Sequence, residues 1–308
     1  MRRVTPEPIG SRRLFDDQPE GCEIIIGNAD VSLKEIEPRS FRCCVTSPPY
    51  WGLRDYGIPH QIGAEPELAD YIENLRTVFQ EVRRVLTDDG TLWLNIGDSY
   101  TSGDRKWRDE DKKNPARAMG YRPPTPPGLK PKDLIGIPWR LAFALQEDGW
   151  YLRSDIIWHK PNCQPESVKD RPTRSHEYLF LFSKSEKYFY DYDAVKESSN
   201  SNGSKRNRRS VWSINTEGFP GAHFATFPTS FVEPCIAAGS EPGDRVLDPF
   251  FGSGTVGEVC LQLDRAFLGI ELKEEYASLA MKRLGWEGCR QGGLRAYPIK
   301  SRSLYQRE

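Results

Sequence analysis

Residues 46–52, from Thr46 to Gly52, have the sequence TSPPYWG and follow a short apolar run, Phe41 to Val45. A run of this length and composition predicts a buried strand. The pair Pro48 and Pro49 ends that strand and stiffens the turn, because each proline fixes φ and lacks an N–H donor. The Ser47 hydroxyl and the neighbouring carbonyls are left without ladder partners at a strand end, where open α/β sheets bind ligands. We therefore expect this turn to contact a ligand.

Two aromatic side chains, Tyr50 and Trp51, lie beside these polar groups. A planar ring with an exocyclic amine would stack on Tyr50 and donate its N–H groups to Ser47 and to the carbonyl of Pro48. An ordinary proline-rich turn with a surface aromatic is the alternative, since short motifs also occur by chance. The turn alone leaves both interpretations open.

A second motif follows a strand predicted over residues 244–247, and its sequence is Asp248-Pro249-Phe250-Phe251-Gly252-Ser253-Gly254-Thr255. A helix over 256–263, a strand over 266–270 and Glu271 come next. This succession is typical of a nucleotide-binding half-fold, in which the acidic residue holds a ribose diol. Asp248, directly before the turn, repels a pyrophosphate and suits a ligand with a positive amine or sulfonium. The motif favours S-adenosylmethionine over a dinucleotide; a structural glycine turn is the alternative.

The rest of the chain predicts alternating strands and helices. Strands are expected over 23–26, 41–46, 91–96, 150–158 and 178–182, and helices over 31–37, 66–86, 134–147, 228–238 and 273–284. Residues 88–90 (DDG) are expected as a turn, and residues 188–190 as a strand that pairs with 178–182 in a hairpin. Asp30, after the first strand, either contacts a ligand or caps the next helix.

Two segments differ in composition from the rest of the chain. Residues 101–132 are charged and then proline-rich, which predicts a partly ordered insertion. Residues 198–209 are rich in Ser, Asn and Gly and end in a basic run. Cations followed by a tryptophan suit contacts with phosphates and bases, with a solvated loop as the alternative. The candidate nucleic-acid-binding residues are Lys205, Arg206, Arg208, Arg209 and Trp212.

Length and composition set the class of protein. The 308 residues suffice for one large α/β domain or two domains, and the net charge of -1 still allows a local basic face. The 7 cysteines are scattered without a CxxC pattern, which predicts reduced cytosolic thiols and no metal site. The charged segment Met1 to Asp17 lacks the apolar core of a signal peptide, and no run approaches a membrane span.

Taken together, the two motifs resemble those of the amino-group DNA methyltransferases, which methylate N4 of cytosine or N6 of adenine. Their order, with the catalytic motif first, resembles the circularly permuted β class. The resemblance covers about residues 22–284 and includes His223-Phe224-Ala225-Thr226-Phe227-Pro228 and Gly269-Ile270-Glu271. It implies a permuted Rossmann-like fold, a mostly parallel sheet with helices on both faces, plus a small target-recognition insertion.

The same resemblance divides the chain into parts. Residues 22–190 would form the catalytic-motif part, 191–222 a target-recognition segment, 223–284 the cofactor-binding part of the same domain, and 285–308 a tail. The implied partner is double-stranded DNA, with a cognate restriction endonuclease possible, in the cytoplasm of a bacterial or phage-infected cell. Neither a metal nor a membrane is implied, and the oligomeric state is left open.

Residue roles also follow from the resemblance. Ser47 and the carbonyl of Pro48 would accept the two N–H groups of the target amine, and Tyr50 would stack on the flipped base, with Pro49 completing the catalytic motif. The cofactor would contact Asp248, Pro249, Phe250, Gly252, Gly254 and Thr255 near its methionine, Glu271 at its ribose, Phe227 and Thr229 (within residues 226–229) at its carboxylate, and Asp30 near its adenine.

The identity of the target base rests on one residue. Many members of the resembled family with serine in the first motif act on cytosine N4, whereas aspartate or asparagine there is commoner for adenine. Ser47 therefore favours cytosine, and adenine N6 is the alternative. More remote alternatives are an RNA base, a protein glutamine, or a DNA-binding relative without activity. A recognition-sized insertion argues against a protein substrate, and an intact set of motif residues argues against lost activity.

Overall fold

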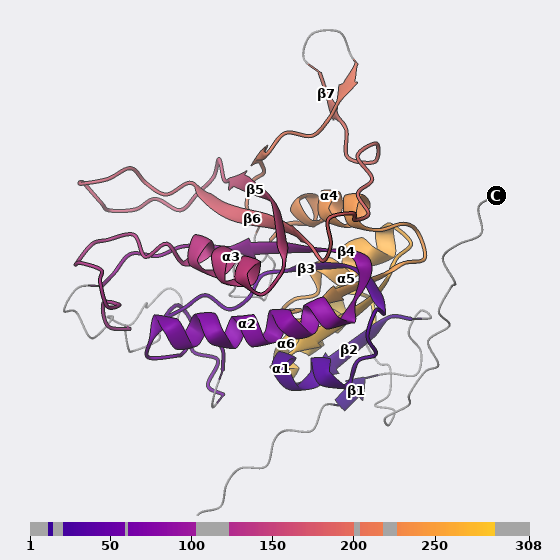
Figure 1. Ribbon diagram of the computed structural model, residues 1–308, viewed down its shortest axis with the longest axis horizontal. Coiled ribbons are helices and arrows are strands. Elements are labelled where there is room, and N and C mark those ends of the chain that lie inside the picture. The colour runs from indigo at the N-terminus through magenta and orange to yellow at the C-terminus, as the bar shows by residue number, and fades with distance from the viewer. Residues whose placement is uncertain are drawn as a thin grey trace, which may run out of the picture.

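Five parallel strands form the centre of the sheet (Figure 1). In spatial order they are β2 (Glu23–Ile26), β11 (Ala266–Glu271), β10 (Arg245–Asp248), β3 (Phe41–Thr46) and β4 (Leu86–Ile96). The computed structural model describes residues 12–14 (backbone only), 21–58, 61–102, 123–199, 204–217 and 227–286. Strand β3 is buried along its whole length, as its apolar sequence predicts.

Antiparallel pairs flank this parallel centre. Strand β1 (Arg12–Leu14) pairs with β2 at one edge. At the other side β6 (His176–Ser183) lies between β4 and β5 (Tyr151–His159), antiparallel to both. Strand β9 (Val211–Ser213) closes that edge by pairing in parallel with β5. A separate ribbon is formed by β7 (Glu197–Ser198) and β8 (Lys205–Arg206).

Helices cover both faces of the sheet, as the sequence predicts. One face packs against α1 (Ala29–Ser32), η1 (Leu33–Glu35), α2 (Leu68–Val85) and α3 (Ile137–Glu147). The other face packs against α4 (Thr229–Gly239), α5 (Thr255–Gln262) and α6 (Glu274–Arg283). Within the described ranges, we find no helix with the length and apolar character needed to cross a membrane.

The chain reverses the direction of its crossovers between β3 and β10. From β3 the connection runs through α2 to β4 on one face, and from β10 it runs through α5 to β11 on the other. Such a reversal opens a crevice at the carboxyl ends of the strands, where α/β proteins bind ligands. Because β10 and β11 come from the end of the chain yet lie between β2 and β3, the two sequence motifs meet at this crevice.

Two predicted local elements differ from the structure. The helix expected over 31–37 is instead one turn of α-helix, α1, followed by the 3₁₀ turn η1, and it starts and ends earlier. Residues 88–90, expected as a turn, lie within β4. The pairing of β3 with β4 is irregular there, because the span Phe41–Cys43 of β3 lies opposite the longer span Leu86–Thr91 of β4. The extra residues of β4 bulge there, and the backbone carbonyls of Asp89 and Gly90 accept from Phe189 and Lys184.

The predicted hairpin between 178–182 and 188–190 is wrong. Strand β6 already pairs with β4 on one side and with β5 on the other, so it has no free edge. Residues 188–190 lie outside any strand, and Tyr190 instead stacks on Trp93 with ring centroids 6.3 Å apart.

Candidate active site

A side-chain hydrogen bond joins the two motifs at the reversal point. Thr46 ends β3 and Asp248 ends β10, and the Thr46 Oγ1 donates to Asp248 Oδ1 over 2.7 Å. The same carboxylate oxygen accepts from the backbone N–H of Phe250 at 3.0 Å. Asp248 is 1% exposed, and desolvation by burial raises its pKa to about 7. The free protein therefore holds a carboxyl group that a nearby cation would ionise.

The second acidic residue, Glu271, fastens the glycine-rich turn to the end of β11. Its Oε2 accepts from the N–H of Gly252 at 2.8 Å and its Oε1 from the N–H of Lys273 at 2.9 Å. Burial raises the pKa of Glu271 to about 7 as well. Two buried carboxyls thus lie at the ends of adjacent strands, β10 and β11, on either side of the glycine turn.

The glycine turn needs its glycines. Gly252 and Gly254 have φ values of 54° and 79°, in the left-handed region that L side chains rarely adopt. A Cβ on Gly254 would also lie 2.9 Å from Cβ of Ala280 on α6. Thr255 starts α5, and its hydroxyl accepts from Arg283 Nη1 at 2.8 Å. The glycine turn is therefore held in one conformation, and a ligand can approach its backbone closely.

Asp30 lies in the first turn of α1, next to the end of β2. Its Oδ1 is buried and has no hydrogen-bond partner among the described residues. The helix cap position is occupied by Asn28, not by Asp30. Of the two sequence interpretations, the ligand contact therefore fits better than the cap, because a buried acceptor without a donor is costly unless a ligand supplies one.

Tyr50 projects from the TSPPY turn into a pocket beside the end of β4. Its hydroxyl donates to Glu177 Oε2 at 2.9 Å, and Asn95 Nδ2 donates to the same oxygen at 3.3 Å. Burial, and after it the charge of Glu177, holds the pKa of Tyr50 well above its ordinary value. The phenol therefore stays protonated and remains a donor. The pocket floor is Gly97, where a Cβ would lie 2.6 Å from Cε2 of Tyr50.

The rest of the turn is fixed by its neighbours. The Tyr71 hydroxyl on α2 donates to the carbonyl of Pro49 at 2.9 Å, and the indole N–H of Trp51 donates to the carbonyl of Glu65 at 2.8 Å. Pro48 is buried, whereas Ser47 is half-buried and lies beside the phenol of Tyr50. The TSPPY turn is thus preorganised, and its Ser47 side chain remains partly accessible.

Helix α4 brings its first residues to the same edge of the sheet. Phe231, in its first turn, packs on Trp158 near the end of β5, with ring centroids 4.4 Å apart. At the other end of the helix, Gly239 lies against Cys43 and Thr91, lower in the sheet. Phe227 and Thr229 are therefore near the ligand edge, while residues 223–226 lie outside the described residues.

This geometry accords with the family comparison. Residues 41–282 match the model of a DNA methylase family whose members modify N6 or N4 positions. The chain belongs to this DNA methylase family. The match spans both motifs and every strand of the parallel centre except β2.

Curated relatives resemble the methylase over nearly their full length. The type II methyltransferase M.SmaI of Serratia marcescens is 64% identical over 279 residues, covering 88% of this chain and 96% of that protein. M.Cfr9I of Citrobacter freundii, also a type II methyltransferase, is 62% identical, covering 92% and 96% respectively.

Solved structures share the fold of the methylase. The PvuII DNA methyltransferase, described as cytosine-N4-specific, superposes with a TM-score of 0.65 at 21% identity, covering 87% of this chain and 89% of that one. TTHA0409 of Thermus thermophilus, complexed with S-adenosyl-L-methionine, has a TM-score of 0.57 at 23% identity, with 85% and 95% covered. The Rossmann-like fold expected from the sequence is confirmed.

The predicted basic segment of the methylase is partly neutralised. Arg206 and Arg209 donate from Nε to the same oxygen of Glu197, at 2.9 and 2.7 Å. Arg208 lies over the ring of Trp212, 4.4 Å from its centroid, and its buried Nε has no partner among the described residues. Lys205 is exposed at the start of β8.

One predicted DNA contact needs correction. Trp212 is only 6% exposed, and its indole N–H donates to the carbonyl of Arg209 at 2.8 Å. The ring packs between Trp93 and Phe231, so it belongs to the core and is closed to an incoming base. The apolar ring of Trp212 attaches β9 to the sheet. A local sequence pattern does not reveal this packing.

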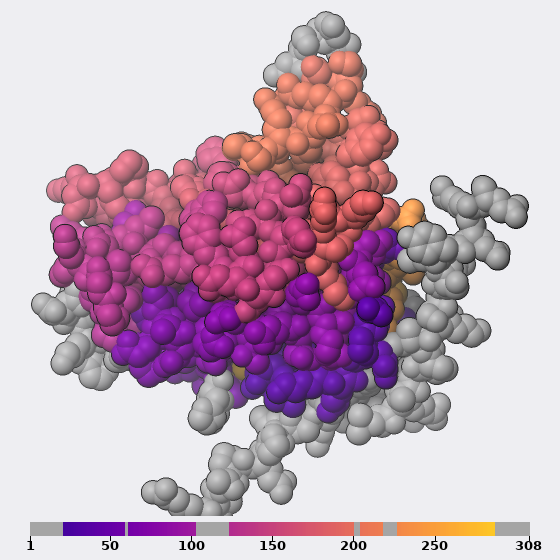
Figure 2. All heavy atoms as spheres, in the orientation of Figure 1, coloured from indigo at the N-terminus to yellow at the C-terminus, as the bar shows by residue number. Residues whose placement is uncertain are grey.

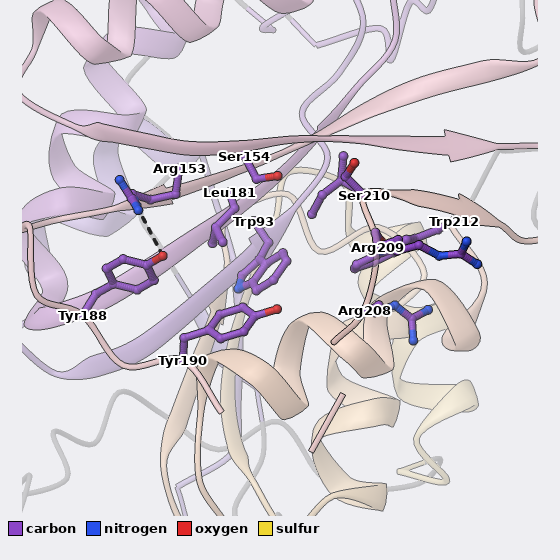
Figure 3. Close-up of a pocket in the computed structure, with 11 residues that line it drawn as sticks. Trp93, Arg153, Ser154, Leu181, Tyr188, Tyr190, Arg208, Arg209, Ser210 and Trp212 are labelled. Carbon is purple, nitrogen blue, oxygen red and sulfur yellow. Dashed lines mark hydrogen bonds between the residues drawn. The ribbon is translucent and has the colours of Figure 1, made fainter. Parts of the chain in front are cut away.

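Beside Trp212 the methylase has an arginine-rich pocket of about 190 Å³ (Figure 3). Arg208 and Arg209 line one side, and Arg153 lines the other, donating to the Tyr188 hydroxyl at 3.3 Å. Tyr190 stacks on Trp93 between them. None of the described residues that line the pocket is acidic, so the pocket suits an anionic group.

Several polar residues near Tyr50 carry no local signal in the sequence. Glu177 stands at the start of the antiparallel strand β6, and Asn95 lies inside β4. Asp98, which also lines the Tyr50 pocket, accepts at Oδ1 from the backbone N–H groups of Gly136 and Ile137, both at 3.0 Å. Only Asp98, at the carboxyl end of a parallel strand, could have been singled out by its position.

The cysteines of the methylase show no metal chemistry in the described ranges. The six described cysteines are free, and five of them are buried. No group of three or more His, Cys, Asp or Glu side chains there could hold a metal ion. Burial raises the pKa of Cys43 to about 12 and that of Cys44 well above its ordinary value, so both are inert core thiols at neutral pH.

Proposed function

We propose that this methylase transfers a methyl group from S-adenosylmethionine to N4 of a cytosine in double-stranded DNA. The observation that carries the proposal is the hydrogen bond between Thr46 and Asp248. This bond supports the proposal because it joins the turn that would accept the amine to the carboxyl that would favour a sulfonium ligand. The two reactants would therefore meet at the reversal point between β3 and β10.

The residues at this point fit S-adenosylmethionine. Asp30 offers a buried acceptor that has no donor in the described part of the chain, and Glu271 offers carboxylate oxygens for ribose hydroxyls. Gly252 and Gly254 leave the backbone open, and Asp248 lies where a positive charge would be favoured. When bound, the cofactor supplies an electrophilic methyl group with a good leaving group attached.

The chain's own residues would prepare the amine. An aromatic amine is a poor nucleophile because its lone pair is delocalised into the ring. The Ser47 hydroxyl and the Pro48 carbonyl would each accept a hydrogen bond from one N–H of the amine. These hydrogen bonds favour a tetrahedral nitrogen with an available lone pair. Tyr50 would stack on the extruded base. These groups act by orientation and electrostatic preorganisation, and the base must first leave the duplex at a cost of a few kcal/mol.

Ser47 supports cytosine as the target, because serine in this motif accompanies cytosine specificity in many members of the family. The PvuII enzyme, described as cytosine-N4-specific, has the same fold. Adenine N6 is the second candidate. We further propose that residues 191–222 form the target-recognition segment and that the enzyme works beside a cognate restriction endonuclease, which the type II designation of its relatives favours.

Nucleoside mass spectrometry of DNA from cells expressing the protein tests the proposal. N4-methylcytosine is expected, confined by long-read sequencing to one short motif. A Ser47→Ala variant should lose most of the mark while still binding cofactor in a calorimeter. N6-methyladenine would overturn the base assignment, and neither mark with cofactor bound would overturn the proposed substrate.

A further inference from the structure

The hydroxyl of Tyr50 is held by a residue from a distant part of the chain. Tyr50 lies after β3, whereas Glu177 lies at the start of β6, yet the Tyr50 hydroxyl and Glu177 Oε2 are 2.9 Å apart. A hydrogen bond to a charged acceptor is stronger and more directional than one between neutral groups. The ring of Tyr50 is thus anchored at its tip as well as at its backbone.

Glu177 itself is held by two further side chains, Lys160 and Asn95. Lys160 Nζ lies 2.5 Å from the other carboxylate oxygen, Oε1, and also stacks over the ring of Trp158 at 4.0 Å. Asn95 Nδ2 donates to Oε2 at 3.3 Å and to the carbonyl of Tyr178 at 3.0 Å. The side chains of Lys160 and Glu177 are 15% and 19% exposed, so solvent screens this ion pair only weakly.

The hydrogen bond at the Tyr50 hydroxyl is the contact that fixes the angle of the tyrosine ring. On one side, Gly97 after β4 leaves room for the ring, since a Cβ there would lie 2.6 Å from Cε2 of Tyr50. The side chain has only two rotatable bonds, so contacts at the backbone, at the ring face and at the hydroxyl define its position fully. A ring without the last contact could tilt within the pocket.

We propose that Glu177 is a positioning residue for methyl transfer: held by Lys160 and Asn95, it fixes through the Tyr50 hydroxyl the plane on which the extruded base stacks. This inference rests on the proposed stacking role of Tyr50. A small misplacement of the base lowers the rate strongly, because the amine must face the methyl group in line.

Two conservative variants act on the same hydrogen bond from opposite ends: one removes its donor and the other removes the charge of its acceptor. Tyr50→Phe keeps the ring, and Glu177→Gln keeps the shape of the acceptor but removes its charge. Each should lower kcat by about 10- to 100-fold, the effect of one hydrogen bond to a charged group. The double variant should be no slower than the slower single variant, because both act through one contact. The KM for S-adenosylmethionine should stay unchanged.

A spectroscopic readout separates positioning from general damage. Duplex DNA with 2-aminopurine at the target position should show a longer fluorescence lifetime with Tyr50→Phe or Glu177→Gln than with the wild-type protein, because the extruded base stacks less firmly. Tyr151→Phe and Glu186→Gln, both at exposed positions, are the matched controls and should behave as wild type. Unfolding curves of all variants show whether the fold is kept.

The outcomes distinguish the two levels of the proposal. Wild-type kcat in Glu177→Gln with a loss in Tyr50→Phe would overturn the role of Glu177 alone, as would additive losses in the double variant. A Tyr50→Ala variant that methylates at the wild-type rate would instead overturn the stacking role of Tyr50, on which the inference depends.

Discussion

At the scale of single residues, the ligand edge is defined by two buried carboxyls. Asp248 and Glu271 each accept a few hydrogen bonds from neutral donors, and burial raises the pKa of each carboxyl to about 7. A protein tolerates such groups at a cost, and they commonly mark functional sites. The free enzyme holds them protonated in mildly acidic solution, and a bound cation would draw Asp248 into its charged form.

This arrangement predicts a pH dependence of stability. Because the folded-state pKa of each carboxyl lies above its unfolded value, the folded protein binds protons more tightly. Their stabilising contribution is fully present below about pH 4 and is lost as the pH rises through about 7. The free energy of unfolding of the wild type, relative to an Asp248→Asn variant, should therefore fall between pH 5 and pH 8 in urea titrations. A Glu186→Gln control should keep the wild-type slope, and equal slopes in all three proteins would contradict the prediction.

At the scale of elements, β7, β8 and the segment before β9 form an arm. The arm projects from the body of the molecule in Figure 2, beyond the edge formed by β5 and β9. Within it, Glu197 pairs with two of the four cations, Arg206 and Arg209. Lys205 and Arg208 are left as its stronger candidates for contact with DNA phosphates.

The arm makes a prediction about salt dependence. A Lys205→Ala, Arg208→Ala double variant should weaken DNA binding and reduce the slope of log K against log salt by about 1.8, since each lost phosphate contact removes about 0.9. Fluorescence anisotropy at several salt concentrations measures the slope. Replacing Arg206 and Arg209 should reduce it less, because Glu197 already compensates them. Lys34→Ala, an exposed cation on η1, serves as the control. An unchanged slope in the double variant would place the phosphate contacts elsewhere.

At the scale of the whole molecule, the sequence predicted the strands and turns that depend on local patterns. The buried strands, the glycine turn and the TSPPY turn each depend on residues close together in the chain, and they form where expected. The sequence placed Ser47 and Asp248 each at a strand end, and the strand order brings Thr46 and Asp248 together at one edge of the sheet. Glu177, the burial of Trp212 and the absent hairpin depend on which strands pair with β6 and β9. That choice depends on packing between distant segments, which one sequence does not reveal.

The hydrogen bond between Thr46 and Asp248 joins residues 202 positions apart and links the first part of the chain to the last. Both side chains are buried, so a Thr46→Val variant keeps the packing but leaves one carboxyl oxygen with a single donor. We expect its free energy of unfolding to fall by about 1–3 kcal/mol, the contribution of one hydrogen bond to a buried carboxyl group.

The same variant should bind S-adenosylmethionine more weakly in calorimetry, because a carboxyl with fewer donors ionises less readily beside a cation. Thr77→Val is the matched control. The Thr77 hydroxyl donates to the Glu73 carbonyl within one helix, so its loss should change stability by no more than about 0.5 kcal/mol. If Thr46→Val matched the wild type in both stability and affinity, the bond would not couple the two motifs. The ligand edge would then be assembled by the strand order alone.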